Sequence, residues 1–413
     1  MFAIKFSIKL CILIVLTSGT YSFATPSNEL SKLLEISRNR LNVTQLNGTP
    51  LNDGRAFELT SSTWLTGLPS ISLSYLGSLD NSNIYEQEVS LNLPIKSFGL
   101  HNSDKRLKKL TLELEGQQVA LQKLYLSGLL RQSIWDYRIA SVKIKQLNRK
   151  AKLLDKLYVQ HKQLSDAGEL PKVNILLLER EHVDIDLDQI VLKQQQSEAL
   201  SLFNSVTGLS VIPQKINEQY REITEANLSI HHGINDALIQ HPLWQIQSLR
   251  QQQQLLIIKS QQAGEQDSWT LSLTAKETAD DQFNDQQLGL GISIPISLGS
   301  ALSQSELSIW QKDHQEQSLN SERTYLELKT QTEKLAMKQQ NLRKQQLLLQ
   351  RGVSLSRTIT EDLAKVKDQS QISYEIWLRR YMDALDTESR LLLNQITQQQ
   401  LHSQQLQALG ISL

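Results

Sequence analysis

Two stretches of the chain decide its fold: EVSLNLPI at residues 88–95 and LGLGISIPI at residues 288–296. In both, apolar residues alternate with small or polar ones, and this period of two is typical of a β-strand. A second alternating stretch precedes each of them, PSISLSY at 69–75 and SWTLSLT at 268–274. The sequence therefore predicts two strand pairs, within 66–95 and 268–296, as copies of one duplicated unit.

Two tracts without proline follow these strand pairs, at 95–170 and 296–413. Proline interrupts helices, so both tracts are free to form very long ones. Apolar residues recur there with a period of seven, which indicates helices that pack side by side along a narrow stripe. We predict helical hairpins over 103–210 and 302–410, and a single helix over 103–165 would reach about 93 Å.

The apolar stripes can be assigned residue by residue. In the returning helix of the first hairpin the stripe contains Leu178, Ile185, Leu192, Ala199 and Val206. In the outgoing helix of the second hairpin it contains Leu328, Leu335, Leu342, Leu349 and Leu363. In the last helix it contains Leu378, Leu385, Leu392 and Leu406, with Gln399 also in the stripe.

Each predicted hairpin has a recognisable tip. The first tip, near 166–174, contains Gly168, which suits a helix C-terminus, and Pro171, which suits a new helix start. The second tip, near 367–375, contains Ser370, and Ser373 is placed to cap the returning helix. Both tips lie at the ends of the rods that are far from the strands.

The N-terminus carries the pattern of a secretory signal. Lys5 and Lys9 precede an apolar run, and Ser22 and Ala24 suit a cleavage site. We predict a signal peptide over 1–24, because the run is too short to anchor the chain in a membrane. No later stretch of ~18 apolar residues exists, so a secreted chain of this kind would enter a membrane only as a β-barrel.

Charge and side-chain chemistry exclude several function classes. The 413 residues contain 43 basic and 43 acidic side chains, which leaves no electrostatic footprint for nucleic acid. The single cysteine, Cys11, lies in the predicted signal peptide, and His231-His232 has no third ligand at metal spacing. Neither a phosphate-binding loop nor a nucleophile–base set is present. We expect no enzyme, no cofactor and no metal.

The strand pattern has two interpretations. Apolar residues on one face and small polar residues on the other are typical of a barrel with a lipid-facing outside and a wet interior. A soluble sheet that covers a core predicts the same alternation, but the chain has no other sign of such a core. Four strands cannot close a channel, and open strand edges are not tolerated in lipid. Several copies must therefore share one barrel.

The order and duplication of several features resemble the outer-membrane efflux protein family, whose best-known member is TolC. These features are the strand endings at Pro94 and Pro295, the two tips, His241-Pro242 and Leu409-Gly410. The resemblance covers nearly the whole chain after the signal. It implies an α+β membrane protein whose long hairpins form a periplasmic α-barrel, and whose four strands enter a shared trimeric transmembrane β-barrel. It also implies a homotrimer in outer-membrane lipid, a periplasmic adaptor and an inner-membrane pump.

The first repeat departs from the second beside the rods. The second repeat has a linker and an equatorial helix within 211–262, with the helix itself expected over 235–262. The first repeat has only the segment 25–65, in which about 27–42 looks helical before Asn47-Gly-Thr-Pro50 and Asn52-Asp-Gly54 interrupt it. We expect this region to be reduced or irregular.

The resemblance also assigns candidate site residues. In relatives, carboxylates just after the second tip narrow the periplasmic opening of the channel, and Glu375 stands at this position. The alternative interpretation is that a carboxylate in the first turn of a helix is favoured by the helix dipole alone. Further candidates for this aperture are Asp166, Glu169, Arg379 and Arg380. The exposed tips supply the candidate adaptor contacts, Gly168, Leu170, Pro171, Ser370, Ile372 and Ser373.

The sequence is compatible with two functions from different classes. The leading one is the outer-membrane exit duct of a tripartite efflux or secretion system, in a Gram-negative-type bacterium. The alternative is a periplasmic coiled-coil scaffold without channel activity, which predicts a soluble protein. The cargo stays open among drugs, metal ions and polypeptides, because the pump sets that choice.

Overall fold

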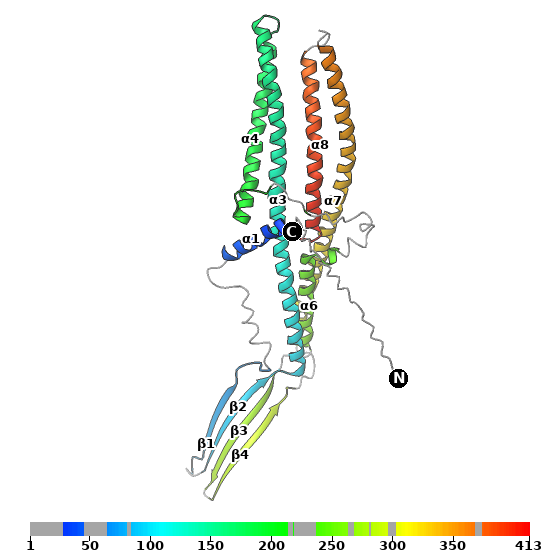
Figure 1. Cartoon of the computed structure of the whole chain (residues 1–413). Coiled ribbons are helices and arrows are strands. Elements are labelled where there is room, and N and C mark those ends of the chain that lie inside the picture. The colour runs from blue at the N-terminus through cyan, green and yellow to red at the C-terminus, as the bar shows by residue number, and fades with distance from the viewer. Residues whose placement is uncertain are drawn as a thin grey trace, which may run out of the picture.

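The computed structural model describes residues 28–44, 64–80, 84–213, 218, 237–262, 268–280, 282–295, 303–367 and 374–413. Two long helical hairpins occupy one end of the molecule, and a four-stranded antiparallel sheet occupies the other (Figure 1). The predicted combination of long helices and four strands is confirmed. The predicted signal peptide, the pair His231-His232 and most of the segment 25–65 lie outside the described residues.

The sheet consists of β1 (Ser70–Gly77), β2 (Tyr85–Ile95), β3 (Trp269–Asp280) and β4 (Phe283–Ser293). The strands pair in sequence order, so β1 and β4 form its two edges. β3 and β4 extend beyond the apolar alternation that predicted them, into a polar segment where Lys276 Nζ lies 2.6 Å from Glu86 Oε1. Backbone pairing continues there without apolar side chains, so hydropathy alone underestimates the length of these strands.

The first hairpin is made of α3 (Phe98–Asp166) and α4 (Val173–Thr207). α3 has 69 residues, which corresponds to about 100 Å of uninterrupted helix. It begins before the predicted residue 103 because Ser97 caps it, with the Leu100 amide donating to Ser97 Oγ at 3.1 Å. α4 ends at Gly208, whose φ of 79° is the left-handed conformation that glycine adopts readily.

The heptad stripe predicted for α4 is confirmed. Its five residues have exposed fractions of 9% or less. Towards the tip, Leu178 and Ile185 of this stripe pack with Leu154 and Leu157 of α3 in one apolar cluster. The first hairpin is therefore held together by aliphatic packing along its length.

The second hairpin is made of α7 (Gln304–Lys367) and α8 (Tyr374–Ala408), and the stripe predicted for α8 is partly wrong. Leu392 is 37% exposed and Gln399 is exposed, whereas Leu401 is 1% exposed and Asn394 is buried. The residues that face α7 include amides, which a search for apolar positions passes over.

An amide ladder joins α7 and α8. Gln398 Nε2 donates to Gln346 Oε1 at 2.8 Å, and Gln405 Nε2 donates to Gln339 Oε1 at 2.7 Å. Gln398 also donates to Asn394 Oδ1 at 2.7 Å, on its own helix. Each of these bonds pairs a donor with an acceptor at a part-buried position, which avoids the penalty of leaving these atoms without a partner there.

The middle of the molecule contains a compact apolar cluster where α1 (Asn28–Thr44) crosses α3 and α4 (Figure 1). Leu33 of α1, Leu130 of α3 and Phe203 of α4 are among its buried members. α6 (Pro242–Gln262) lies against both α3 and α7 on the sheet side of this cluster. The helix predicted over 235–262 is interrupted at 240–241, because residues 237–239 are helical and Pro242 opens a new helix. His241 Nδ1 accepts from the Leu243 amide at 3.2 Å at this new start.

Truncation of the central cluster should destabilise the protein. Phe203 is fully buried, so we expect Phe203→Ala to lower the free energy of unfolding by about 3–5 kcal/mol. The matched control is Ser201→Ala, two residues away on the exposed side of α4, which should change it by less than about 0.5 kcal/mol. Thermal unfolding of the helical circular dichroism signal in detergent measures both, and equal midpoints for the two variants would contradict this description of the core.

Acid should destabilise the junction at the start of α6. Burial lowers the pKa of His241 from 6.5 to about 4. Between these values the unfolded chain binds a proton that the folded chain does not, so stability is complete above pH 6.5 and is lost as the pH falls towards 4. At about 1.4 kcal/mol per pKa unit, the full loss is on the order of 3 kcal/mol. Denaturant unfolding from pH 7.5 to 4.5 measures it, and His241→Asn, which can still cap the helix, should flatten this part of the profile.

Candidate functional site

One face of the sheet is aliphatic across all four strands. The strand register aligns Ile71, Leu91, Leu273 and Leu290 in a row that crosses the whole sheet. Ile71 is 70% exposed and Leu290 is 79% exposed. The neighbouring rows on this face carry Leu73 and Val89 on one side and Leu93 and Ile292 on the other. No described helix covers this face, which leaves a large apolar surface in contact with its surroundings.

The opposite face carries small polar side chains that bond to one another. Asn92 bridges two neighbours, because its Nδ2 donates to Ser72 Oγ at 3.2 Å and its Oδ1 accepts from Ser272 Oγ at 2.8 Å. Ser90 Oγ and Thr274 Oγ1 lie 3.2 Å apart in the next row. These side chains are small enough to leave space above the sheet, and they favour water over lipid.

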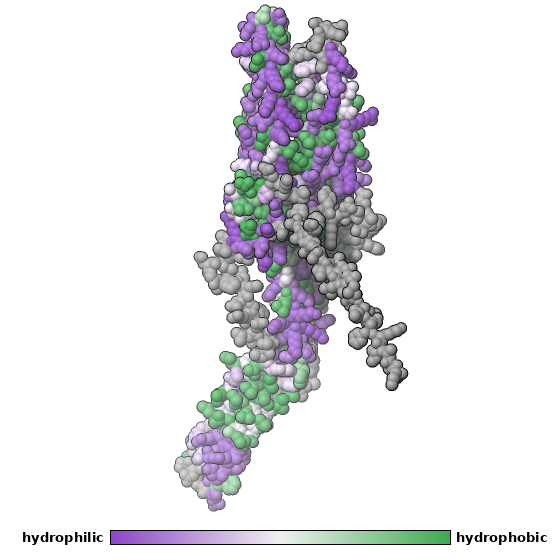
Figure 2. Space-filling model, in the orientation of Figure 1, coloured by the Kyte–Doolittle hydropathy of each residue, from purple (hydrophilic) through white to green (hydrophobic). Residues whose placement is uncertain are grey.

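An aromatic cluster marks the junction between the sheet and the helices. The ring of Trp64 stacks on His101 with centroids 3.9 Å apart, and Phe98 meets both Trp64 and Trp269 edge to face. The apolar part of the sheet adjoins this junction, and its far end is hydrophilic (Figure 2). Aromatic rings at one border of an apolar band are typical of an interface between lipid and water.

The tip of the first hairpin is exposed. Asp166, Gly168, Glu169 and Pro171 are all exposed, and Leu170 is half-buried. Gly168 has a φ of 78°, and the Glu169 amide donates to the Leu164 carbonyl at 2.9 Å. The turn is therefore closed by its own backbone, and its side chains are available to a partner.

The tip of the second hairpin is described only in part. Ser370, Ile372, Ser373 and the side chain of Glu375 lie outside the described residues, although Glu375 belongs to the first turn of α8. Of the predicted aperture residues on α8, Arg379 and Arg380 are exposed. Arg380 Nη1 lies 3.4 Å from Asp383 Oδ2, a residue that the sequence analysis did not single out.

The two hairpins meet through groups that the sequence analysis missed. Near the tips, Trp377 of α8 stacks on Tyr381 and packs against the cluster that contains Leu154. Further along, the Lys150 ammonium of α3 pairs with the Asp386 carboxylate of α8. The ion pair joins residues far apart in sequence, so no local sequence pattern predicts it. The aromatic contact had one local sign, the apolar spacing of 377, 378, 381 and 382.

Among the described residues, no helix combines the length and the apolar character needed to cross a membrane. In the same part of the chain, no group of three or more His, Cys, Asp or Glu side chains is placed to hold a metal ion.

Comparison with solved structures places this architecture among known ones. The chain superposes on the outer membrane protein VceC of Vibrio cholerae with a TM-score of 0.68 and 12% identity, covering 93% of this chain and 97% of that chain. For CusC, whose structures concern transmembrane channel formation, the TM-score is 0.67 at 15% identity, and the match covers 93% of this chain and 92% of that chain. For the open state of the MtrE outer membrane channel of Neisseria gonorrhoeae, the TM-score is 0.63 at 14% identity. This match covers 92% of this chain and 89% of that chain.

The chain has the fold of these outer-membrane channels. The resemblance read from the strand endings, the tips and their duplication is thus confirmed at the level of the fold. By sequence, no family model and no curated protein matches the chain. The outer-membrane channel fold was therefore recognisable from the spacing of strands and heptads in a chain that has diverged far from the solved examples.

Proposed function

We propose that the protein is a passive exit duct of the outer membrane, in which copies of the chain share one transmembrane β-barrel and one periplasmic helical tunnel. The observation that carries this proposal is the two-faced sheet. Its aliphatic face is exposed from Ile71 to Leu290, and its other face is lined by Ser72, Asn92 and Thr274. A lipid-facing outside and a wet inside require this division.

The open edges of the sheet support the oligomer. Within the described part of the chain, β1 and β4 each have one side without a strand partner, and such backbone groups must be paired inside a bilayer. Pairing β4 of one copy with β1 of the next satisfies both edges. Three copies give a barrel of about twelve strands, wide enough for a water-filled lumen. The repeated unit of strand pair and hairpin then appears twice per copy around the ring.

The aromatic cluster at Trp64, Phe98 and Trp269 supports the placement in the outer membrane. Phe98 is 64% exposed and Trp64 is 46% exposed, which suits rings that rest in the headgroup layer. With the sheet in lipid, α3 extends about 100 Å away from it, into the periplasm of a Gram-negative-type cell. The duct itself provides no energy source, so an inner-membrane pump and a periplasmic adaptor complete the system.

The tips are the proposed functional end of the tunnel. The proposed adaptor contacts are Gly168, Leu170, Pro171, Ser370, Ile372 and Ser373. Glu375, from each of three copies, is the proposed carboxylate ring that narrows the opening and favours cations. Asp166, Glu169, Arg379 and Arg380 are proposed to support the same constriction; the exposed ion pair of Arg380 with Asp383 is one element of it.

Charge on the aliphatic face should block assembly, whereas charge on the polar face should not. Leu273→Lys places an ammonium in lipid, and we expect a loss of about 2–4 kcal/mol that removes most trimer from the outer membrane. The matched variant Thr274→Lys, on the adjacent residue of β3, should assemble normally and shift the channel towards anions. Membrane fractionation and planar-bilayer recordings measure the two effects. Normal assembly of Leu273→Lys would contradict the lipid-facing assignment.

The aperture assignment predicts a change in ion flow. Glu375→Gln removes the proposed ring of negative charge, so the selectivity for cations and the block by divalent cations should both weaken several-fold. Glu333→Gln, an exposed carboxylate of α7 far from the tip, is the control and should leave both unchanged. If the Glu375→Gln traces match those of the original protein, the carboxylate serves only the helix dipole.

Cell fractionation separates the duct from the coiled-coil scaffold. A duct requires detergent for its extraction from outer membranes, sizes as a trimer and conducts ions. A mature protein that stays in the soluble periplasmic fraction would instead establish the scaffold. A susceptibility panel on a deletion strain, covering drugs and metal ions, then identifies the cargo.

A further inference from the structure

The start of α3 carries a dense group of cations next to the sheet. Lys105, Arg106, Lys108 and Lys109 lie within five residues, and no acidic residue separates them. On α6, which lies beside this part of α3, Lys259 belongs to the last turn before the chain enters β3 (Figure 1). These five side chains form a basic collar between the sheet and the middle of the molecule.

A groove between α3 and α6 passes through the basic collar. It has a volume of about 460 Å³, and Arg106, Lys109 and Lys259 supply the cations that line it. Leu110 and Leu255 add apolar surface to the same groove. Apolar walls beside a cation displace water, which strengthens the attraction of that cation for an anion. The groove therefore favours an anionic group.

Nearby carboxylates leave most of this positive charge uncompensated. Asp104 is already engaged, because Lys96 Nζ lies 2.7 Å from Asp104 Oδ2. Glu113 also lines the groove, but its Oε1 lies 3.9 Å from Lys109 Nζ and both side chains are exposed, so this ion pair is weak. Among the described residues, no carboxylate forms an ion pair with the other four cations of the basic collar.

The strand register indicates which side of α3 faces outwards. Trp269 stands two residues before Leu271 in β3, so both side chains lie on the aliphatic face of the sheet. Phe98 meets Trp269 edge to face with ring centroids 5.6 Å apart, which places Phe98 on that side too. Lys105 and Lys109 follow Phe98 by seven and eleven residues, and these spacings return to the same face of an α-helix. These two cations therefore face the side that is lipid in the proposed duct.

The basic collar also lies within reach of lipid headgroups. At about 1.5 Å per residue, Lys105 is about 10 Å and Lys109 about 16 Å from the level of Phe98. Side chains of a helix tilt towards its N-terminus, which for α3 is the sheet end, and long basic side chains extend further in that direction. The polar layer of a bilayer is about 5–8 Å thick on each side, and charges act over a further Debye length of about 8 Å. Both cations therefore act on headgroup phosphates.

We propose that the basic collar binds the phosphate of anionic phospholipids in the periplasmic leaflet of the outer membrane, with the groove between α3 and α6 as its centre. This inference rests on the proposed placement of the sheet in that membrane, and it specifies which lipids surround the base of the tunnel. Ammonium and guanidinium groups donate strong hydrogen bonds to phosphate oxygens. A zwitterionic lipid carries no net charge, so the collar prefers phosphatidylglycerol to phosphatidylcholine.

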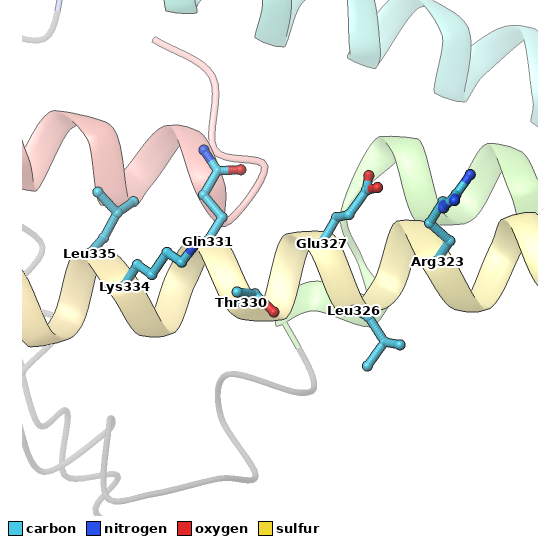
Figure 3. A pocket seen from close by; sticks show the side chains of 7 residues that line it. All are labelled: Arg323, Leu326, Glu327, Thr330, Gln331, Lys334 and Leu335. Atoms are coloured by element: carbon cyan, nitrogen blue, oxygen red, sulfur yellow. The ribbon is translucent and has the colours of Figure 1, made fainter.

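A second groove provides a control, because it carries cations without the same surroundings. It lies along α7, has a volume of about 660 Å³, and is lined by Arg323, Glu327 and Lys334 among others. Arg323 and Glu327 point to the same side of α7, so positive charge is balanced locally there (Figure 3). Arg323 also lies about 28 Å along α7 from its sheet-side start at Gln304. Headgroups do not reach this groove.

Spin-labelled lipids test the basic collar in the full-length protein. The protein is reconstituted in phosphatidylcholine with a trace of spin-labelled phosphatidylglycerol or spin-labelled phosphatidylcholine. Electron paramagnetic resonance then measures the fraction of each label whose motion the protein restricts. We expect a several-fold preference for phosphatidylglycerol that falls as the salt concentration rises. Arg106→Gln, Lys109→Gln and Lys259→Gln together should bring the two labels close to equal.

Two control variants separate charge from other effects of substitution. Arg323→Gln, Lys334→Gln and Lys338→Gln together remove three exposed cations of α7, and this variant should keep the preference for phosphatidylglycerol. Lys109→Arg with Lys259→Arg retains the charge of the basic collar and should keep the preference as well. All five positions are exposed, so each protein should fold normally.

Three results would overturn the inference. Equal restriction of both labels by the unmodified protein would show that the basic collar is only a solvated surface. A collar variant that keeps its lipid preference but changes the ion selectivity of the channel would place the groove in the lumen. Stronger displacement by sodium phosphate than by sodium chloride at equal ionic strength would identify a site for free phosphate. In each case a conducting trimer leaves the duct intact, whereas a protein that does not enter the bilayer contradicts the proposed function itself.

Discussion

Every backbone amide and carbonyl that enters a bilayer must find a hydrogen-bond partner within the protein, and the sheet cannot meet this condition alone. β2 and β3 are paired on both sides, whereas β1 and β4 are paired on one. In lipid, the aliphatic row from Ile71 to Leu290 would gain from burial only if those edges were closed. In the proposed duct, the need to pair two edges links the sheet to the oligomer, and the oligomer to the arrangement of the helical hairpins.

The two hairpins solve the same packing problem with different chemistry. α3 and α4 are joined by an aliphatic seam that includes Leu178 and Ile185. α7 and α8 are joined in part by paired amides such as Gln346 and Gln398. Aliphatic seams gain from the hydrophobic effect, whereas paired amides contribute about 1 kcal/mol each and mainly fix the register.

Periodicity made most of this architecture predictable. Alternation located the four strands, and the heptad of α4 identified five of its buried residues but passed over Phe203. The same method wrongly placed Leu392 in the seam of α8. Polar side chains occupy this part of the seam and hydrogen-bond in pairs, which hydropathy does not record. Contacts such as Lys150 with Asp386 depend on how whole helices are placed, and no local pattern encodes that placement. The roles proposed for the tip side chains require partners and symmetry, which a single chain does not contain.

The strand order β1-β2-β3-β4 gives each chain two different sheet edges, and in the proposed shared barrel this has a genetic consequence. In a closed ring of such chains, a copy with a damaged β1 still offers an intact β4 to its neighbour. It can enter an assembly and leave a break at its other side. In a cell that makes both normal and altered chains, such an allele would be dominant negative, because one altered chain would inactivate a mixed ring. A minority of altered chains would then inactivate the majority of the proposed ducts.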